Sequence, residues 1–290
     1  MRFSIRPVAL LSVALLAAAC DVKVGEQGIS LDVAHGKASD EWKRTYTLPT
    51  GGQLEIVNIN GVIEGFPATG TQVELTARRE VRAGSDEEAQ AQLAKAEMIE
   101  EISPTRVKVA LKTDREAGAG PTLRSRSRLN IQYRVGVPKG LQISFRTENG
   151  AVRLENLDGR ITAASTNGPV VGRGLSGSID ASTVNGGVEI EIESLTGDSR
   201  VVTVNGPATL SLAPGVGAEL DASAVNGGVS VHQDMPLTAT ERTGRRVAGR
   251  INDGGPTIVV QTTNGGVRVG TPGSGRGFGR RGRGRAPAGG

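Results

Sequence analysis

From Asn149 onward, apolar and polar residues alternate along the chain in a pattern that returns about every twenty residues. Each return is marked by an Asn-Gly pair, and the spacings between these pairs are 18, 18, 20, 21 and 38 residues. Alternation with a period of two is typical of strands with one buried face, so each repeat is predicted to hold two short strands. The last spacing suggests two repeats of 19 whose middle pair is replaced by a turn near residues 252–254. The asparagines of the pairs, with one earlier example, are Asn60, Asn149, Asn167, Asn185, Asn205, Asn226 and Asn264.

Each repeat is predicted to turn at two corners. Asn-Gly suits the first, because these residues tolerate the positive φ of a tight turn. The second lies about half-way round, where a Leu-x-Gly pattern stands at 157–159, 175–177 and 195–197. Two topologies fit this pattern: a parallel β-solenoid whose repeats stack at about 4.8 Å, and a meander with Asn-Gly as the hairpin loop.

We favour an all-β solenoid with repeats of roughly 18–21 residues, because one residue type recurring at one corner suits the stacking of like on like. Such stacking would form a ladder of asparagine side chains. The interior should be narrow, since residues 150–269 contain no aromatic residue and Ala, Val, Ile and Thr must fill it.

The segment before the repeats is predicted to combine strands with one helix. Ser85 and Glu88 have the spacing of a capping box. Apolar residues at 93, 96, 99 and 102 then follow at helical intervals, which predicts a helical insertion over 85–101. We expect this helix to cover an open end of the solenoid; an acidic docking face is the alternative. Alternation predicts strands at 53–59, 73–81, 106–113, 129–137 and 141–147.

The first nineteen residues are interpreted as a signal peptide. Arg2 and Arg6 precede residues 8–19, which are apolar apart from Ser12. This run is too short to span a bilayer, which needs about 20 residues. Three alanines then lead to Cys20, the only cysteine, in a pattern that resembles the lipobox of bacterial lipoproteins, although Ala rather than Leu stands three residues before the cysteine. We interpret Cys20 as the site of a diacylglycerol and an N-acyl chain such as palmitate; an ordinary signal peptide with a chance cysteine is the alternative.

The last 21 residues, 270–290, contain nine Gly, two Pro and five Arg, and are predicted to be disordered. Without these arginines and the two of the signal peptide, the formal charge of +4 becomes −3 for residues 21–269. In an exported protein the tail could contact anionic lipid heads or envelope polymers; a solvated tail without a specific partner is the alternative. Its possible polyanion contacts are Arg276, Arg280, Arg281, Arg283 and Arg285.

Several stretches, including QLEIVNINGVIEG, YRVGVPKGLQISFRTENGAVRLENLDGRITAASTNGPVVG and DASTVNGGVEIE, resemble the bacterial "putative adhesin" domain family. The resemblance covers roughly residues 42–269 and rests on the recurring T-x-N-G-x-V pattern. It implies a β-solenoid domain of unknown biochemical function and brings no catalytic residues. The family name implies surface adhesion, and the association of other members with envelope-stress systems implies a sensing role.

Candidate chemistry is sparse. Asp180, Arg200 and Asp221 share one outward column, so stacking predicts an alternating-charge ladder with the two carboxylates about 10 Å apart. That separation is beyond the range for inverting glycosidases, about 6.5–9.5 Å. Two further groups are interpreted as solvated: an acidic stripe that could bind a cation (Glu189, Glu191, Glu193), and a basic cluster that could bind a polyanion (Arg242, Arg245, Arg246, Arg250). His232 stands near Asp234, but one His and one Asp do not make a zinc site. His35 falls in a polar linker.

The sequence therefore predicts an exported lipoprotein without catalytic residues, metal or cofactor. Residues 1–19 form the signal peptide, 20–41 the tether, 42–269 the solenoid and 270–290 the tail. The expected function is a non-enzymatic, adhesin-like binding scaffold in the cell envelope, facing the periplasm or the exterior. The alternatives are an envelope-stress sensor or regulator acting through a protein partner and, after that, a polysaccharide-active enzyme. Expected partners are the membrane through Cys20 and an envelope polysaccharide, anionic lipid or envelope protein; nucleic acid is not expected.

Overall fold

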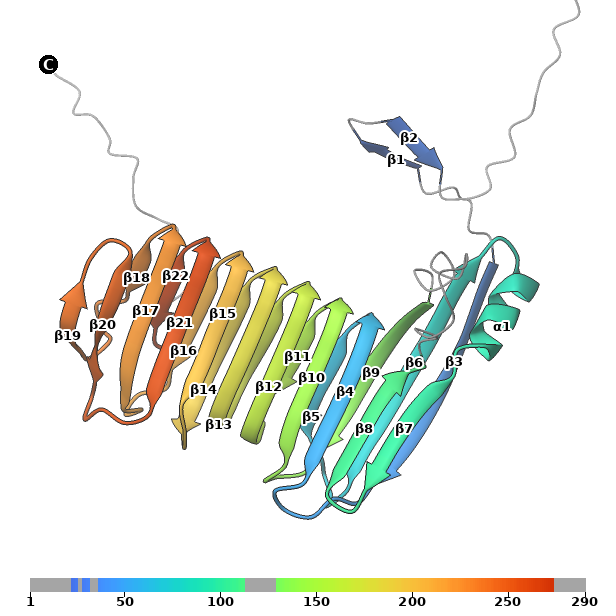
Figure 1. Ribbon diagram of the computed structural model, residues 1–290, viewed down its shortest axis with the longest axis horizontal. Helices are drawn as coiled ribbons and strands as arrows, with labels where there is room; N and C mark the ends of the chain where they lie inside the picture. Colours follow the sequence, from blue (N-terminus) through green and yellow to red (C-terminus); the bar gives the residue numbers. More distant parts are fainter. Residues whose placement is uncertain (1–21, 26–27, 32–35, 113–128, 274–290) are drawn as a thin grey trace, which may run out of the picture.

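The computed structural model describes residues 22–25, 28–31, 36–112 and 129–273. The predicted signal peptide, Cys20, His35 and the tail arginines lie outside the described residues. The body is an elongated β-solenoid formed by one continuous sheet of 20 strands, and we call this body the rack (Figure 1). A separate antiparallel pair consists of β1 (Val22–Gly25) and β2 (Gly28–Leu31). In the part of the chain that the structure describes, no helix has the length and apolar character needed to cross a membrane.

The solenoid has two long faces, which the bent strand β13 connects. Face A consists, in spatial order, of β7 (Met98–Ser103), β8 (Arg106–Leu111), β4 (Gln53–Asn60), β10 (Gln142–Asn149), β12 (Asp158–Asn167), the second half of β13 (Val170–Asn185), β15 (Ser199–Asn205), β21 (Thr257–Asn264), β17 (Ala218–Asn226), β20 (Arg246–Ile251) and β19 (Leu237–Arg242). Face B consists of β3 (Gly36–Tyr46), β6 (Val73–Ala83), β9 (Leu129–Val137), β5 (Ile63–Pro67), β11 (Val152–Glu155), the first half of β13, β14 (Val188–Leu195), β16 (Ala208–Leu212), β22 (Val267–Gly270) and β18 (Val229–Val231).

Parallel pairing between successive coils confirms the solenoid and excludes the meander. Ile143 lies opposite Ile161, and Ile161 opposite Ile179. The column three residues after each asparagine is also in register, from Val152 to Val170 and Val188. The equivalent positions of successive repeats therefore stack on one another, as the period in the sequence predicts.

The asparagines of the corners form the predicted ladder along one edge. The spatial order is Asn60, Asn149, Asn167, Asn185, Asn205, Asn264 and Asn226, and each asparagine after the first donates from Nδ2 to Oδ1 of the one before it at 2.8–2.9 Å. A second row lies inside the corners, where hydroxyls such as Thr183 Oγ1 donate to glycine carbonyls of the neighbouring coil, at 2.8 Å from Gly168. Both rows satisfy polar groups exposed by the sharp change of chain direction.

Glycine at these corners has two structural reasons, of which one was expected. The glycine after the asparagine has the expected positive φ in four coils, with 122° at Gly61, 158° at Gly150, 154° at Gly168 and 158° at Gly206. The ladder asparagines themselves do not, since Asn156 and Asn252 are the only described non-glycine residues with a positive φ. The second reason is close stacking, because a Cβ on Gly168 would overlap the carbonyl oxygen of Gly150 in the next coil.

The chain does not follow the spatial order of the coils at either end. In space, the β4–β5 coil lies between the β10–β11 coil and the outer strands β8 and β9. In the sequence, β8 and β9 come after β5 and before β10. Likewise the β21–β22 coil lies between β15–β16 and the earlier β17–β18 coil. Both ends of the rack therefore finish in antiparallel pairs, β3 with β6 and β7 with β8 at one end and β19 with β20 at the other.

The C-terminal end corrects one expectation. The 38-residue spacing does not hold two parallel coils, because β19 and β20 form an antiparallel hairpin and β20 pairs antiparallel with β17. The unpaired backbone groups of an exposed strand edge can pair with another chain and cause aggregation. A hairpin at the terminus leaves less of the parallel ladder open to such pairing.

The N-terminal end corrects three more. The helix α1 covers only Asp86–Ala94, capped by Ser85, whose Oγ accepts from the Glu88 N–H at 3.2 Å. The rest of the predicted helix forms β7, because the apolar residues after Leu93 alternate opposite β8 instead of continuing a helical stripe. Strand β3 begins at Gly36, inside the predicted tether, and pairs with β6 along its length. Strand β5 was not among the predicted strands.

The helix α1 lies against β3 and β6 at this end of the rack (Figure 1), where it buries Ala89 and Leu93. This position agrees with the expected cover of an open solenoid end. The two faces are also joined here by a side chain, since Tyr46 Oη of β3 donates to Glu100 Oε2 of β7 at 2.7 Å.

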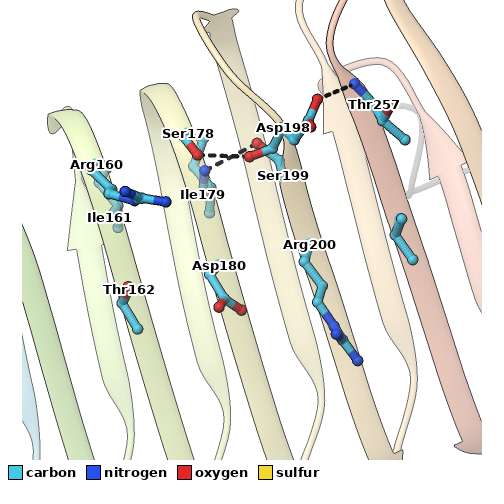
Figure 2. A pocket seen from close by; sticks show the side chains of 11 residues that line it. Arg160, Ile161, Thr162, Ser178, Ile179, Asp180, Asp198, Ser199, Arg200 and Thr257 are labelled. Carbon is cyan, nitrogen blue, oxygen red and sulfur yellow. Dashed lines mark hydrogen bonds between the residues drawn. The ribbon is translucent and has the colours of Figure 1, made fainter.

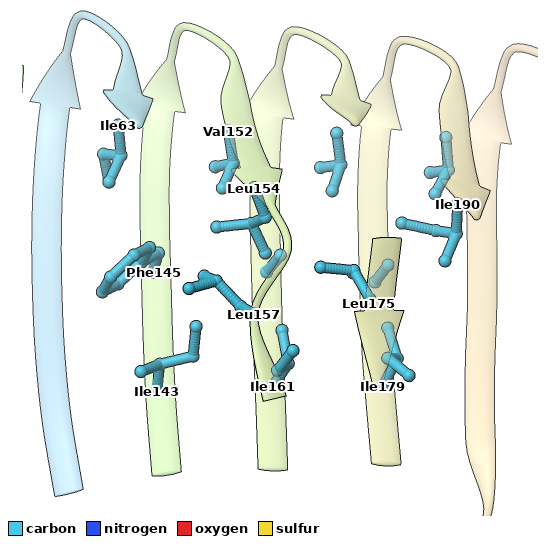
Figure 3. Packing of buried hydrophobic residues seen from close by; sticks show 14 of the residues in the cluster. Ile63, Ile143, Phe145, Val152, Leu154, Leu157, Ile161, Leu175, Ile179 and Ile190 are labelled. Carbon is cyan, nitrogen blue, oxygen red and sulfur yellow. The ribbon is translucent and has the colours of Figure 1, made fainter. Parts of the chain in front are cut away.

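One continuous apolar core runs through the rack, and its rings lie only at the N-terminal end. Phe145 and Tyr133 are fully buried there, whereas the coils after Asn149 are filled by Val, Leu, Ile and Ala (Figure 3). Burial of about 25 cal/mol for each Å² of apolar surface is the main stabilising contribution to such a core.

The hydroxyl of Tyr133 is a weak point in this core. Its Oη is buried and has no hydrogen-bond partner among the described residues, and burial raises the pKa of Tyr133 above its ordinary value. An unsatisfied buried polar group costs about 1–3 kcal/mol, so Tyr133→Phe should increase the free energy of unfolding by about 1 kcal/mol in a urea titration. Tyr46→Phe is the matched control, because it removes the bond to Glu100 and should lower stability. A loss of stability in Tyr133→Phe would contradict the assignment.

Candidate functional site

A polar groove crosses the outer side of face A along the solenoid axis. It consists of two hollows, of about 610 and 230 Å³, which share Arg160 and Thr162 of β12 as lining residues. We call it the axial groove. The first hollow also touches β13, β15 and β21, and the second touches β4 and β10. The polar residues along it are Gln53, Gln142, Ser144, Arg146, Arg160, Thr162, Ser178, Asp180, Asp198, Ser199, Arg200 and Thr257.

The larger hollow forms where the repeat lengthens from 18 to 20 residues. Ser199 takes the place of the isoleucine of its column, and the paired register of β13 with β15 begins only at Asp180 and Arg200. Side chains replace the missing ladder bonds: the Ile179 N–H donates to Ser199 Oγ at 3.0 Å, and Ser178 Oγ donates to the Asp198 carbonyl at 2.6 Å (Figure 2). A short side chain at position 199 and a displaced strand start leave the recess.

On the far side of the recess, the Thr257 N–H of β21 donates to Asp198 Oδ1 at 2.8 Å (Figure 2). Asp198 thus links two strands that are 59 residues apart in the sequence. Hydrogen bonds therefore hold the side of the hollow that β15 and β21 form.

The charged groups of the groove are free to meet a ligand. Among the described residues, no ion pair includes Arg146, Arg160, Arg200 or Asp180, and all four are exposed. Near the ends of face A several arginines are paired: Arg106 with Glu55, Arg246 with Asp221 at 3.1 Å, and Arg250 with Glu219 at 2.9 Å. In the middle of the face, guanidinium donors, hydroxyls and carboxylate acceptors are available together.

The predicted charge ladder of Asp180, Arg200 and Asp221 is wrong. Asp180 does lie opposite Arg200, but Val259 of β21 separates Arg200 from Asp221. The two carboxylates are three strand spacings apart, about 14 Å, which exceeds the glycosidase range further than expected. The sequence could not reveal this, because β21 enters the sheet between two strands that precede it in the chain.

The other sequence candidates are scattered. Glu189 pairs with Arg173 at 3.3 Å, and Glu193 is exposed on the same strand. Two of the four arginines of the basic cluster are paired, Arg246 with Asp221 and Arg250 with Glu219, and His232 lies 3.3 Å from Asp234. In the described ranges, no three His, Cys, Asp or Glu side chains gather in a way that could hold a metal ion.

A stripe of exposed valines runs beside the asparagine ladder on face A. Val184, Val204 and Val225 stand one residue before their asparagines and are 41%, 38% and 60% exposed. Val184 and Val204 lie on neighbouring strands, and β21 separates them from Val225. The stripe lies at the corner edge, apart from the axial groove.

The axial groove was not predicted as a site, although two of its signals stand in the sequence. These are the serine at position 199 in an isoleucine column and the change of spacing from 18 to 20 residues. The tail arginines and Cys20 lie outside the described residues, so the structure places neither beside the groove.

Comparison with known proteins identifies the type of domain. The family profile described as toastrack DUF4097 matches residues 123–270. No curated protein matches the chain.

Structural similarity extends over most of the chain at low identity. A "putative cell adhesion protein" from Clostridium sporogenes ATCC 15579 is 9% identical, with 81% of this chain and 100% of that chain covered at a TM-score of 0.47. A "putative adhesin" from Bacteroides fragilis NCTC 9343 is 12% identical, with coverage of 80% and 97% and a TM-score of 0.33. At TM-scores below 0.5 these likenesses carry no argument about function. The argument about function rests on the residues of this chain.

Proposed function

The chain belongs to the toastrack DUF4097 family, and from that premise we propose that it is a non-enzymatic, adhesin-like binding scaffold anchored in the bacterial cell envelope. The observation that carries the proposal is the axial groove, a bonded recess whose charged side chains have no ion-pair partner among the described residues. A rigid solenoid suits this role, because side chains on neighbouring strands keep a fixed spacing of about 4.8 Å. Contacts along the groove can therefore add up on one extended ligand.

Anchoring is proposed through the lipid on Cys20, with export directed by residues 1–19. The support is the position of the only cysteine directly after an apolar run and three alanines. Two or more acyl chains provide stable attachment where one does not. In cells fed a labelled fatty acid, the label should appear in the chain and be lost in Cys20→Ser; label that persists in Cys20→Ser would overturn the anchor.

The binding role is tested by obstructing face A without altering its charge. Ser182 faces outward between Ala164 and Val202, so Ser182→Tyr places a ring on the middle of the face. The full-length protein should lose about tenfold or more of its affinity for isolated envelope material, a change of about 1.4 kcal/mol. The control is Thr209→Tyr on β16, at the outer side of face B. Equal binding by both variants, or none by the parent, would overturn the proposal.

A second candidate, an envelope-stress sensor or regulator with a protein partner, is favoured by the exposed valine stripe. Exposed apolar rows are typical of protein contacts when they lie together. The change of Val184, Val204 and Val225 to Ser should then abolish partner crosslinking and leave binding to envelope polymer unchanged. The separation of Asp180 from Asp221 argues against the third candidate, a polysaccharide-cleaving enzyme.

A further inference from the structure

The axial groove runs across the strands, in the direction in which the solenoid is stacked. Its lining residues come from six neighbouring strands, β4, β10, β12, β13, β15 and β21. At about 4.8 Å for each spacing, the groove is on the order of 24 Å long. Two residues further along the strands, the outward-facing row consists of the small or medium side chains of Ala164, Ser182 and Val202. This row therefore stands only a little above the sheet. A groove of this length and low relief suits an extended chain better than a compact small molecule.

Arginines recur along the groove. Arg146 of β10 and Arg160 of β12 lie on adjacent strands, and Arg200 of β15 lies two strands further. None has an ion-pair partner among the described residues, whereas Arg106, Arg246 and Arg250 nearer the ends of face A do. A guanidinium fork binds a carboxylate through two parallel N–H···O bonds. Three guanidinium groups without ion-pair partners on one face therefore suit a polymer that carries several carboxylates.

The groups between the arginines select against other polyanions. Asp180 and Asp198 are exposed in the same hollow and would repel a closely spaced row of phosphates. Ligand hydroxyls, in contrast, can donate to these carboxylates and to the oxygens of Thr162 and Ser178. Single-stranded nucleic acids are commonly held by stacking on aromatic residues, and the residues that line the two hollows include none. The same lack of rings removes stacking for a neutral sugar, so charge has to supply the affinity.

We propose that the axial groove binds an extended glycan that carries carboxylate groups, with Arg160 and Arg200 holding carboxylates and Asp180 accepting hydroxyl donors. The inference rests on the proposed binding function and adds the chemical class of the ligand. It distinguishes the groove from the valine stripe, whose residues have no charge to contribute.

The test compares a soluble oligogalacturonate with its methyl ester, which has the same backbone and no charge. The protein is full-length, with the five tail arginines changed to Gln so that the tail does not bind the acidic probe. By calorimetry at low salt, the acid should bind at least about tenfold more tightly than the ester. Arg160→Gln with Arg200→Gln should remove this preference. The matched control is Arg134→Gln with Arg153→Gln on face B, which changes the net charge equally.

Several outcomes would overturn the inference. These are equal affinity for acid and ester, no binding of the acid, an equal loss in the face B control, and tighter binding of a single-stranded DNA oligonucleotide. Failure of the inference differs from failure of the proposed function, because Ser182→Tyr would still lower binding to envelope material if the groove takes another ligand. The thermal midpoints of both double variants should match the parent, since exposed surface substitutions change stability by about 0.5 kcal/mol or less.

Discussion

Gly177→Ala should lower the free energy of unfolding by about 3 kcal/mol or more. Gly177 forms the second corner of its coil within β13, with φ of 121°, a conformation that residues with a Cβ rarely adopt. It also lies opposite Gly159 of the neighbouring coil, and a Cβ would overlap the Gly159 carbonyl oxygen. Strain and a forced backbone shift act together at this position. Chemical denaturation followed by circular dichroism measures the change.

The control for Gly177 is another corner glycine of the same chain segment. Gly187 has no positive φ, and an added Cβ would meet its nearest atom, Pro207 Cγ, at 3.4 Å. Gly187→Ala should therefore change stability by about 0.5 kcal/mol or less. If both variants are equally stable, the stacked backbone is looser at the second corner than the structure has it.

The repeating part of the fold could be predicted from its columns. Stacking of like residues requires the same side chain at the same corner, and the recurring Asn, Thr and Val positions carry that information. The asparagine ladder follows directly, because an amide can donate to one neighbour and accept from another. The sequence indicated the positive φ of the corner glycine but not its close stacking, since the approach of two backbones depends on the neighbouring coil and not on local turn chemistry.

The two ends could not be predicted in the same way. Nothing local in the sequence indicates that β21 inserts between β15 and β17. Nor does it indicate that β4 pairs with β10, because strands β5 to β9 separate the two along the chain. These pairings join residues far apart in the chain, so tertiary packing decides them. The same holds for β7, whose apolar residues fit a helix or a strand until the partner β8 is known.

The candidate site follows from a departure from the repeat. Ser199 breaks an isoleucine column, and its neighbours Ser178 and Asp198 complete the bonds that a regular coil would make through its backbone. The departure is visible in the sequence, but its consequence depends on which strands flank it. Asp198 meets Thr257 only because β21 lies beside β15. The recess in the otherwise regular solenoid therefore results from two features together: the local irregularity at Ser199, and β21, which is distant in the sequence.

Phe145→Ala should lower the free energy of unfolding by about 3–5 kcal/mol, and Gly65→Ala should recover part of that loss. Phe145 is fully buried, and a Cβ on Gly65 of β5 would lie 2.9 Å from its ring carbon Cε2. Figure 3 shows the ring beside Leu154 and Leu157 in the core. In the parent, Gly65→Ala overpacks the site and should cost about 1–3 kcal/mol. Without the ring, the new methyl group fills part of the cavity instead.

The double-mutant cycle separates this explanation from a general intolerance of Gly65 to substitution. The coupling energy between Gly65→Ala and Phe145→Ala should be at least about 1 kcal/mol in favour of the double variant. Gly172→Ala is the matched control. Gly172 occupies the equivalent position two coils from Gly65, and its Cβ would crowd Leu175 and Ile190 and not Phe145. Its effect should add to that of Phe145→Ala within about 0.5 kcal/mol. If Gly65→Ala destabilises both backgrounds equally, the glycine in β5 is required by the backbone and not by the ring.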